Sequence, residues 1–311
     1  MKNQGSINQL KKRIEAIRSQ LHSAFQNKRT FSDPDVYLLS VYLDDLIAEY
    51  QNCIRMDRGQ KKSLSEKLKE NFLQNIELYP LYQRIVRLTN PLEEYAYEAT
   101  IRGRTENGIE IPPSVLFQQS EGTQMLIDYK ARHIAIREAC PLVTNTSLLF
   151  LNGHALSLQA GFIFENVAKL EVPINQLVLE ITEQTRIDNV GLLKQELTAL
   201  RALGMKVALD DFGAGFSNFW LVEELEPEYI KLDRSIIAKV DQSTQARRVI
   251  EGMVVFAEKA NTQLISEGIE RETQRDILVE LGVQYGQGFF LGYPFAITPE
   301  SGGAVRERST S

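Results

Sequence analysis

Apolar residues recur at helical spacing through the first part of the chain. Over residues 6–27 they fall every three or four positions, which predicts an amphipathic helix. The segment Ser32–Pro34 is typical of a helix start, and the apolar stripe after it ends near Tyr50. The pattern therefore predicts an antiparallel two-helix hairpin over residues 1–50. Because two helices bury little apolar surface, we expect the hairpin to pair with a second copy or a partner.

The pattern changes from about Glu77 onward, where short apolar runs alternate with longer helical stretches. This alternation is typical of βα units and predicts an α/β fold, a (β/α)8 TIM-type barrel over residues 77–299. The apolar runs read YAYEAT, SLLFLN, LVLEIT, KVALDD, YIKLD, QLISEG and YGQGFFLG. Residues 51–76 are polar and lysine-rich, and we expect them to form a helical connector. We expect residues 300–311 to be a disordered tail.

Polar residues stand at or just before the ends of all seven apolar runs. They are Glu98, Asn152, Glu180, Asp210 with Asp211, Lys231, Glu267 and Gln287. The strand ends of a barrel converge on one face, where catalytic side chains gather, so we expect these residues to meet there. Seven such coincidences are hard to attribute to turn capping alone.

The adjacent pair Asp210 and Asp211 indicates metal binding. Neighbouring carboxylates repel each other and lose hydration when clustered, and a divalent cation is the usual compensation. The alternative is an aspartate pair that caps a helix or opens a turn. On an ideal strand Asp211 would face away from Asp210, but we expect it to turn inward where the strand gives way to a loop.

Oxygen donors from several strand ends suit two Mg²⁺ or Mn²⁺ ions. Glu98, Asn152, Glu180 and Asp210 come from four different strand ends, and Asp211 can reach a second ion. Two such ions a few ångströms apart form a clamp for in-line hydrolysis of a phosphoester. The sequence therefore predicts phosphoester chemistry at this face of the barrel.

Three further side chains complete the predicted site. Lys231 supplies a cation near the attacking water or the phosphate, and Glu267 a carboxylate that holds or deprotonates the water. Strand alternation puts Arg102 on the same face as Glu98, where its planar fork can grip a phosphate. The competing interpretations are a salt bridge for Lys231, a helix cap for Glu267 and hydrogen bonds to backbone groups for Gln287.

Composition and charge narrow the class of protein. The 311 residues are 43% apolar and 24% charged, as in ordinary globular domains, and no apolar run approaches the roughly 20 residues that span a bilayer. The formal net charge of −6 argues against non-specific DNA binding. Cys53 and Cys140 show no motif spacing and are interpreted as free buried thiols. Because the N-terminus has no signal-peptide pattern, we expect a cytoplasmic protein.

The motifs together resemble the EAL domain, the family of cyclic di-GMP phosphodiesterases, over about residues 78–294. The matching pieces read YQRIV, YEATIR, LEITE, DDFGAGFSN, IKLDRS, SEGIE and GQGFFLGYP. The resemblance implies a barrel with an unusual first strand, often dimeric, that cleaves cyclic di-GMP to linear pGpG with Mg²⁺ or Mn²⁺. It therefore implies cyclic di-GMP as the ligand and a homodimer as the assembly.

The resemblance also implies a role for each matched residue. It assigns metal binding to Glu98, Asn152, Glu180, Asp210 and Asp211. Catalytic roles fall to Glu98, Asp211, Lys231 and Glu267, and nucleotide contacts to Gln83, Arg102 and Gln287. Glu183 matches the glutamate that steadies the loop after Asp211.

One position departs from the family pattern. The triplet that names the family reads Glu98-Ala99-Thr100 here, with threonine in place of leucine. Thr100 faces the predicted pocket, so we expect the change to affect how the ligand sits more than whether metal binds. Every metal position is present, which favours an active enzyme. The alternative is an inactive cyclic di-GMP receptor that signals through the hairpin.

The N-terminal segment resembles a second family, the two-helix sporulation-regulator phosphatases that dephosphorylate an aspartyl-phosphate response regulator. The family's signature Ser-Gln-Glu-Leu-Asp corresponds to Ser40-Val41-Tyr42-Leu43-Asp44 in this chain. Ser40 and Asp44 share a helix face, but valine and tyrosine replace polar groups that could orient water. We therefore expect a dimerisation or partner-docking role. The alternative is a working response-regulator phosphatase.

Overall fold

A computed structural model describes most of the chain from residue 76 to residue 297. The described residues are 76–89, 92–119, 121–144, 146–154, 157–158, 170–182, 190–214 and 219–297. They divide between two compact units. One holds the described parts of Met1–Leu78, Arg102–Lys130 and Leu156–Glu165, and the other those of Tyr79–Ile101, Ala131–Ala155 and Asn166–Ser311. The predicted hairpin and tail, and all of the predicted connector except Ile76, lie outside the described residues.

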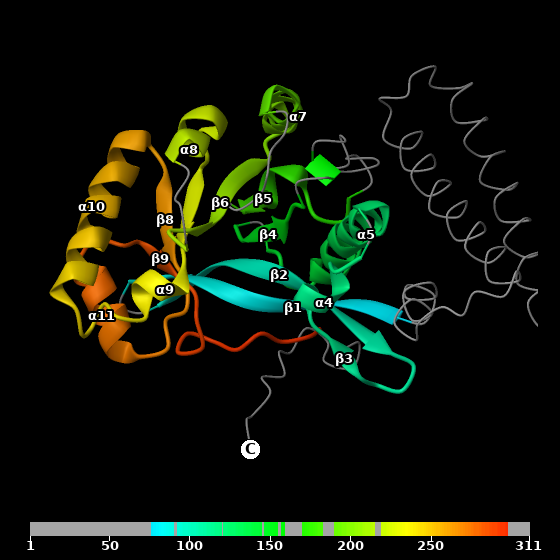
Figure 1. The fold of residues 1–311 in the computed structure, drawn as a ribbon, viewed down its shortest axis with the longest axis horizontal. Coiled ribbons are helices and arrows are strands. Elements are labelled where there is room, and N and C mark those ends of the chain that lie inside the picture. Colours follow the sequence, from blue (N-terminus) through cyan, green and yellow to red (C-terminus); the bar gives the residue numbers. More distant parts are fainter. Residues whose placement is uncertain are drawn as a thin grey trace, which may run out of the picture. The chain divides into compact units, whose positions relative to one another are not determined.

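Eight strands close into a barrel, as the sequence predicts (Figure 1). In chain order they are β1 (Ile76–Arg87), β2 (Glu93–Thr105), β4 (Leu148–Asn152), β5 (Leu177–Thr182), β6 (Lys206–Phe212), β7 (Tyr229–Leu232), β8 (Gln263–Ser266) and β9 (Tyr285–Gly286). They pair in the order β1-β9-β8-β7-β6-β5-β4-β2, and a further pairing of β1 with β2 closes the ring. The (β/α)8 prediction is confirmed.

The first strand runs against its neighbour, while β2 and β4 to β9 pair in parallel. β1 pairs antiparallel with β9, with Val86 opposite Gly286 and Arg87 opposite Tyr285. The apolar pattern did not reveal this strand, because polar and charged residues are interspersed along it. Its direction accounts for the unusual first strand that the family resemblance implies. A short strand, β3 (Glu110–Ile111), pairs antiparallel with Gly103 and Arg104 of β2, and all of these residues belong to the unit that contains Arg102–Lys130.

Helices follow the barrel strands along the chain. They are α4 (Pro113–Leu116), α5 (Glu121–Ala139), α7 (Val190–Ala202), α8 (Phe219–Leu225), α9 (Arg234–Ile237), α10 (Thr244–Ala260) and α11 (Glu272–Glu280), with a 3₁₀ turn, η3 (Ile174–Gln176), before β5. Local caps fix where α10 begins and ends. Ser243 accepts a hydrogen bond from the Ala246 N–H at its start, and Asn261 takes a left-handed φ of 53° at its end.

Cys140 corrects one expectation from the sequence. The residue is a free thiol, but it is exposed and not buried. It directly follows the last residue of α5, where the chain turns away from the helix toward β4. Cys53 lies outside the described residues.

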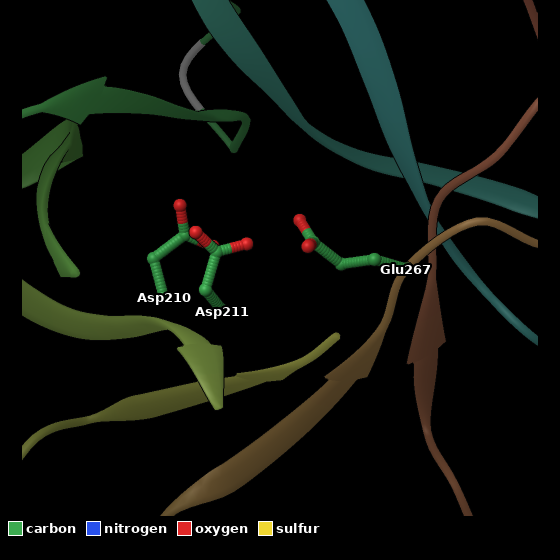
Figure 2. A group of neighbouring side chains, drawn as sticks. All are labelled: Asp210, Asp211 and Glu267. Carbon is green, nitrogen blue, oxygen red and sulfur yellow. The ribbon is translucent and has the colours of Figure 1, made fainter. Parts of the chain in front are cut away.

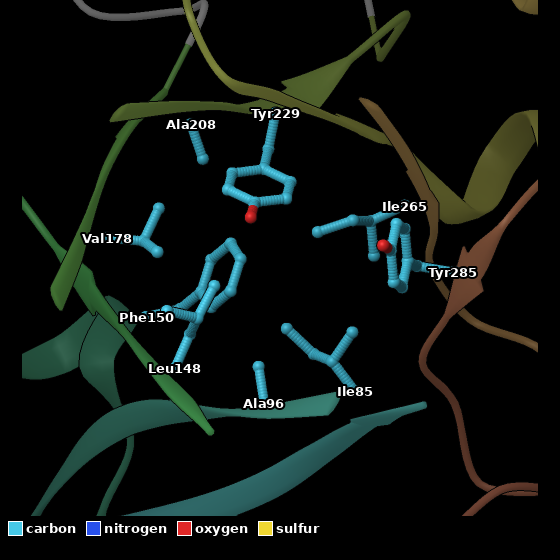
Figure 3. Close-up of a cluster of buried hydrophobic side chains, with 9 residues drawn as sticks. All are labelled: Ile85, Ala96, Leu148, Phe150, Val178, Ala208, Tyr229, Ile265 and Tyr285. Atoms are coloured by element: carbon cyan, nitrogen blue, oxygen red, sulfur yellow. The ribbon is translucent and has the colours of Figure 1, made fainter. Parts of the chain in front are cut away.

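A hydrophobic cluster fills the barrel interior. Every barrel strand contributes to it, and Figure 3 shows the side chains pointing into the space that the strands enclose. The members are Ile85, Ala96, Leu148, Phe150, Val178, Ala208, Tyr229, Ile265 and Tyr285. The Tyr229 hydroxyl is satisfied by the hydroxyl of Tyr95, which packs against the cluster, at an O–O distance of 2.6 Å. This layer supports the polar residues described next.

Candidate active site

The candidate site is the next layer of the same barrel interior. Side chains alternate between the two faces of a strand, so the residue two positions beyond a core residue shares its face. Two positions along, Ala96 leads to Glu98, Phe150 to Asn152, Val178 to Glu180, Ala208 to Asp210, Tyr229 to Lys231, Ile265 to Glu267 and Tyr285 to Gln287. On the antiparallel β1 the step runs backward, from Ile85 to Gln83. Strand register therefore places the predicted residues at one end of the barrel.

Asp211 joins this layer because β6 is irregular. The pairing of β6 with β7 shifts register between Leu209 and Phe212, and Asp211 has a left-handed φ of 56°. Such an irregularity re-aims a side chain. In Figure 2 the carboxylates of Asp210 and Asp211 lie side by side and face Glu267, and ligand atoms of the three lie within 4.8 Å of one another. The expected inward turn of Asp211 thus arises within the strand and not in a loop after it.

Lys231 lies among the carboxylates. Its side chain has no solvent exposure, and its Nζ approaches carboxylates from four other strands or strand ends. The distances are 2.6 Å to Glu180 Oε1, 2.7 Å to Glu267 Oε1, 3.0 Å to Asp210 Oδ1 and 3.4 Å to Glu98 Oε2. The single salt bridge considered as an alternative understates this arrangement, because one ammonium is shared by four acidic groups.

The shared ammonium and the most buried carboxylate both show how crowded the negative charge is. Burial alone would lower the pKa of Lys231, but the surrounding carboxylates outweigh burial and raise it well above its ordinary value. Burial raises the pKa of Glu180 well above its ordinary value, and the Lys231 ammonium only partly opposes the rise. The site therefore has more negative charge than its own lysine compensates.

The carboxyls nearer the opening are shifted in the same direction. Burial raises the pKa of Glu267 to about 8; Lys231 opposes the rise, whereas Asp210 adds to it. Burial likewise raises the pKa of Asp211 to about 6, helped by the negative charges of Asp210 and Asp233. Both carboxyls thus hold a proton more strongly than they would in water, and an added cation would favour its release.

The donor set fits hard divalent cations. Within the described part of the chain, both carboxylate oxygens of Glu180, Oδ1 of Asp210 and Nζ of Lys231 have no partner in hydrogen-bond geometry, although the ion-pair distances are short. A buried polar atom without such a partner costs about 1–3 kcal/mol. When all are ionised, the five carboxylates of the site and the Lys231 ammonium leave four negative charges, which two divalent ions would neutralise. The five are Glu98, Glu180, Asp210, Asp211 and Glu267. Oxygen-only ligands suit Mg²⁺ and Mn²⁺.

Two glutamines hold Glu98 in place. The Gln287 amide nitrogen donates to Glu98 Oε2 at 2.5 Å and to Gln83 Oε1 at 2.9 Å. Gln83 in turn donates from its amide nitrogen to the Gly292 carbonyl at 2.8 Å. The side-chain contacts of Gln287 thus differ from the backbone role considered as an alternative. Nucleotide contact by Gln83 and Gln287 stays a prediction.

Asn152 contacts a residue of the neighbouring strand β2 and a residue of helix α5. Its amide nitrogen donates to the Ala99 carbonyl on β2 at 3.5 Å. This hydrogen bond uses the amide nitrogen, so the amide oxygen is the atom that would bind a metal ion. Its backbone carbonyl accepts a long hydrogen bond, also 3.5 Å, from Arg132 on α5. Arg132 is buried, and no motif in the sequence pointed to it. An arginine amid the apolar residues of a helix was the available signal.

The remaining predicted residues fall in different places. Arg102 lies on the far part of β2, in the other compact unit, so its phosphate contact stays a prediction. Thr100 is half-buried on β2. Glu183, Ser40 and Asp44 lie outside the described residues.

Comparison with known families gives two matches. The sequence profile described as "EAL domain" matches residues 65–294, about three-quarters of the chain. This match begins earlier than the resemblance drawn from the motifs. A second profile, described as "Spo0E like sporulation regulatory protein", matches residues 10–52.

Individual relatives agree with the first match. Cyclic di-GMP phosphodiesterase RocR of Pseudomonas aeruginosa is 33% identical over 150 residues, covering 47% of this chain and 38% of its own length. Probable cyclic di-GMP phosphodiesterase PdeN of Escherichia coli is 28% identical over 268 residues, covering 81% of this chain and 49% of its own. The chain thus spans half or less of the length of these relatives.

A solved structure shows the same fold. BlrP1 of Klebsiella pneumoniae, in a complex with manganese and cyclic di-GMP, superposes with a TM-score of 0.61 at 25% identity. The superposition covers 71% of this chain and 55% of that one.

Among the helices that the structure describes, none has the length and apolar character needed to cross a bilayer.

Proposed function

Because the chain belongs to the EAL domain family, we propose that it hydrolyses cyclic di-GMP to linear pGpG with two divalent ions, Mg²⁺ or Mn²⁺. The observation that carries the proposal is the gathering of Glu98, Glu180, Asp210 and Glu267 around Lys231 within 3.4 Å. Barrel packing brings together at one point carboxylates that are far apart in the sequence, and their charge exceeds that of the lysine.

Each group has a definite task in the proposed reaction. Glu98, Asn152, Glu180, Asp210 and Asp211 would hold the ions. When bound, the ions supply Lewis acidity and lower the pKa of water. The new bond would form between a water oxygen and phosphorus while the bond to the ribose 3′ oxygen breaks, and that oxygen would take up a proton from solvent and leave as the 3′ hydroxyl.

The chain's own residues handle the proton and the phosphate charge. Burial makes Glu267 hold a proton in the metal-free protein; with the ions bound it would be ionised and could take the proton of the attacking water. Lys231 is suited to balance charge on the phosphate oxygens in a water-poor setting. Arg102, Gln83 and Gln287 would bind the nucleotide, and Glu183 would steady the loop after Asp211.

Turnover by the full chain tests this proposal. Purified protein with Mg²⁺ or Mn²⁺ should convert cyclic di-GMP to pGpG, followed by chromatography of the nucleotides. Glu98→Ala should abolish conversion while keeping the circular dichroism spectrum. Glu94→Ala, an exposed glutamate on the same strand, is the matched control and should retain activity. Failure of the unmodified chain to turn over the nucleotide in either metal would falsify the proposal.

The departure at Thr100 favours one competing function. Thr100 lies two positions beyond Glu98 on β2 and is half-buried, so a change there alters the surface that meets a ligand. A non-catalytic cyclic di-GMP receptor would bind the nucleotide tightly by calorimetry without releasing pGpG over hours. Restoration of turnover by Thr100→Leu would identify this residue as the cause.

The N-terminal segment carries a separate part of the proposal. Its match to the sporulation-regulator family over residues 10–52 supports a role in forming a homodimer or docking a response regulator. The changed signature between Ser40 and Asp44 argues against phosphatase activity of this segment. Sedimentation of the full chain and of residues 77–311 should show whether the segment is needed for a dimer.

We also propose a cytoplasmic location, because a nucleotide signal would be met in that compartment.

A further inference from the structure

We propose that the Lys231 ammonium and a divalent ion compete for the same carboxylates, so that Lys231 sets how tightly the site binds metal. The inference rests on the metal site of the proposed function and adds a determinant of affinity to it. Its basis is geometric. Nζ lies 2.6–3.4 Å from four carboxylate oxygens. Three belong to the proposed metal ligands Glu98, Glu180 and Asp210, and the fourth belongs to Glu267.

The surroundings of the ammonium resemble a cation cage. Its four contacts are ion pairs with carboxylate oxygens from four strands or strand ends, so the ammonium is surrounded by oxygens on several sides. Divalent ions bind oxygens in a similar surround at shorter distances, about 2.0–2.6 Å. One point cannot hold both cations, and an ion that binds the same carboxylates is repelled by the ammonium beside them.

The protein leaves the lysine side chain as the part that can give way. Lys231 lies within β7, where Ile230 and Leu232 on either side are fully buried, so its backbone is held by packing. Its flexible four-carbon stem can carry the ammonium to a new position. Metal arrival would therefore displace the ammonium from the carboxylates, and in the proposed reaction the displaced group is available to a phosphate.

Competition predicts that removal of the ammonium tightens metal binding. The variant Lys231→Met keeps the length of the side chain and removes the charge. Mn²⁺ titration of the full chain, followed by the electron paramagnetic resonance signal of free Mn²⁺, should show at least a tenfold lower Kd than the unmodified protein. Lys239→Met, which changes an exposed lysine, is the matched control and should leave the Kd unchanged.

The outcomes separate this inference from the function on which it rests. An equal or higher Kd in Lys231→Met would overturn the inference and leave the metal site intact. If the unmodified chain bound no Mn²⁺ at millimolar concentration, the proposed metal site would fail as well.

A second measurement covers a folding defect in the variant. Without the ammonium, the buried carboxylates are uncompensated, so Lys231→Met should unfold more easily than Lys239→Met in a chelator and recover in Mn²⁺. Thermal unfolding followed by circular dichroism measures both states. A variant that stays unfolded in Mn²⁺, or that is equally stable with and without Mn²⁺, would show that metal and ammonium are not interchangeable.

Discussion

The amide nitrogen of Gln287 donates to Glu98 Oε2 at 2.5 Å and thereby links β2 with the chain just after β9, 189 residues further along. The same nitrogen donates to Gln83, so a single amide group connects β1 and β2 with the segment that follows β9. Hydrogen-bond partners of metal-binding carboxylates orient those carboxylates and affect metal affinity. Gln287 is thus a positioning residue for the proposed ligand Glu98.

Loss of this amide should weaken the site without unfolding the barrel. Gln287→Leu removes both donations and leaves Glu98 free to rotate, so we expect roughly 10–100-fold lower metal affinity or turnover. Gln284→Leu, an exposed glutamine three residues earlier, is the control and should change neither. Mn²⁺ titration and nucleotide turnover are the measurements. Unchanged metal affinity and turnover in Gln287→Leu would mean that Glu98 needs no such support.

Gly288 should tolerate no side chain. It has a φ of 156°, and an added Cβ would lie 2.2 Å from the backbone nitrogen and oxygen of Ile269. Because backbone atoms cannot move aside cheaply, Gly288→Ala should lower the free energy of unfolding by about 2 kcal/mol or more. Gly252→Ala is the contrasting variant, because its Cβ meets nothing within 4 Å inside α10. It should stabilise by about 0.5–1 kcal/mol, and chemical denaturation would measure both.

The left-handed backbone of Asp211 predicts which substitutions it accepts. Asparagine tolerates this conformation and keeps the side-chain shape, so Asp211→Asn should leave the melting temperature within a few degrees and weaken Mn²⁺ binding. Asp211→Val places a β-branched residue at φ 56° and should cost about 1–2 kcal/mol in addition. If both variants melted alike and bound Mn²⁺ as the unmodified chain does, neither the strain nor the ligand role would stand.

Stability should depend on pH in opposite ways with and without metal. Burial raises the pKa of Glu267 to about 8 and that of Asp211 to about 6, above the ordinary values of 4.5 and 3.8. The folded metal-free protein therefore binds more protons than the unfolded chain, and its stability should fall as the pH rises from about 5 to 9. Bound Mn²⁺ favours the ionised carboxylates and should reverse this trend. Denaturant midpoints across the pH range, with chelator or Mn²⁺, measure the effect.

A variant isolates the contribution of Glu267 to that trend. Glu267→Gln cannot ionise, so the metal-free variant should lose less stability between pH 5 and 9 than the unmodified chain. Glu270→Gln, an exposed glutamate three residues later, should leave the slope unchanged. Equal slopes in all three proteins would show that Glu267 is not the group that titrates.

Much of the barrel follows from the sequence, because each parallel strand is a short apolar run that ends in a polar residue. The runs that end at Glu180 and Asp210, for example, became β5 and β6. The first strand did not follow, since its partner lies near the other end of the chain and polar side chains interrupt it. Pairing of β1 with β9 depends on contacts that no local pattern contains.

The site follows from the sequence to a similar extent. The ends of the apolar runs identified the residues that gather. The register shift that turns Asp211 inward could not be predicted, because it arises from the pairing of β6 with β7 and no local sequence pattern marks it. Nor could the sequence show that Lys231 contacts four carboxylates at once, which depends on how the strands are staggered around the ring. The amide link from Gln287 to Glu98 joins residues too far apart in the chain to be inferred from spacing.

The two-residue step from the hydrophobic layer to the polar layer makes packing and chemistry inseparable. A slip of one residue along β6 would set Leu209 among the acidic groups and turn Asp210 outward toward the helices. The same slip would remove Ala208 from the hydrophobic cluster. A barrel with the wrong strand register therefore loses both core packing and the arrangement of acidic groups, so that the packing of the core also selects the register that the site requires.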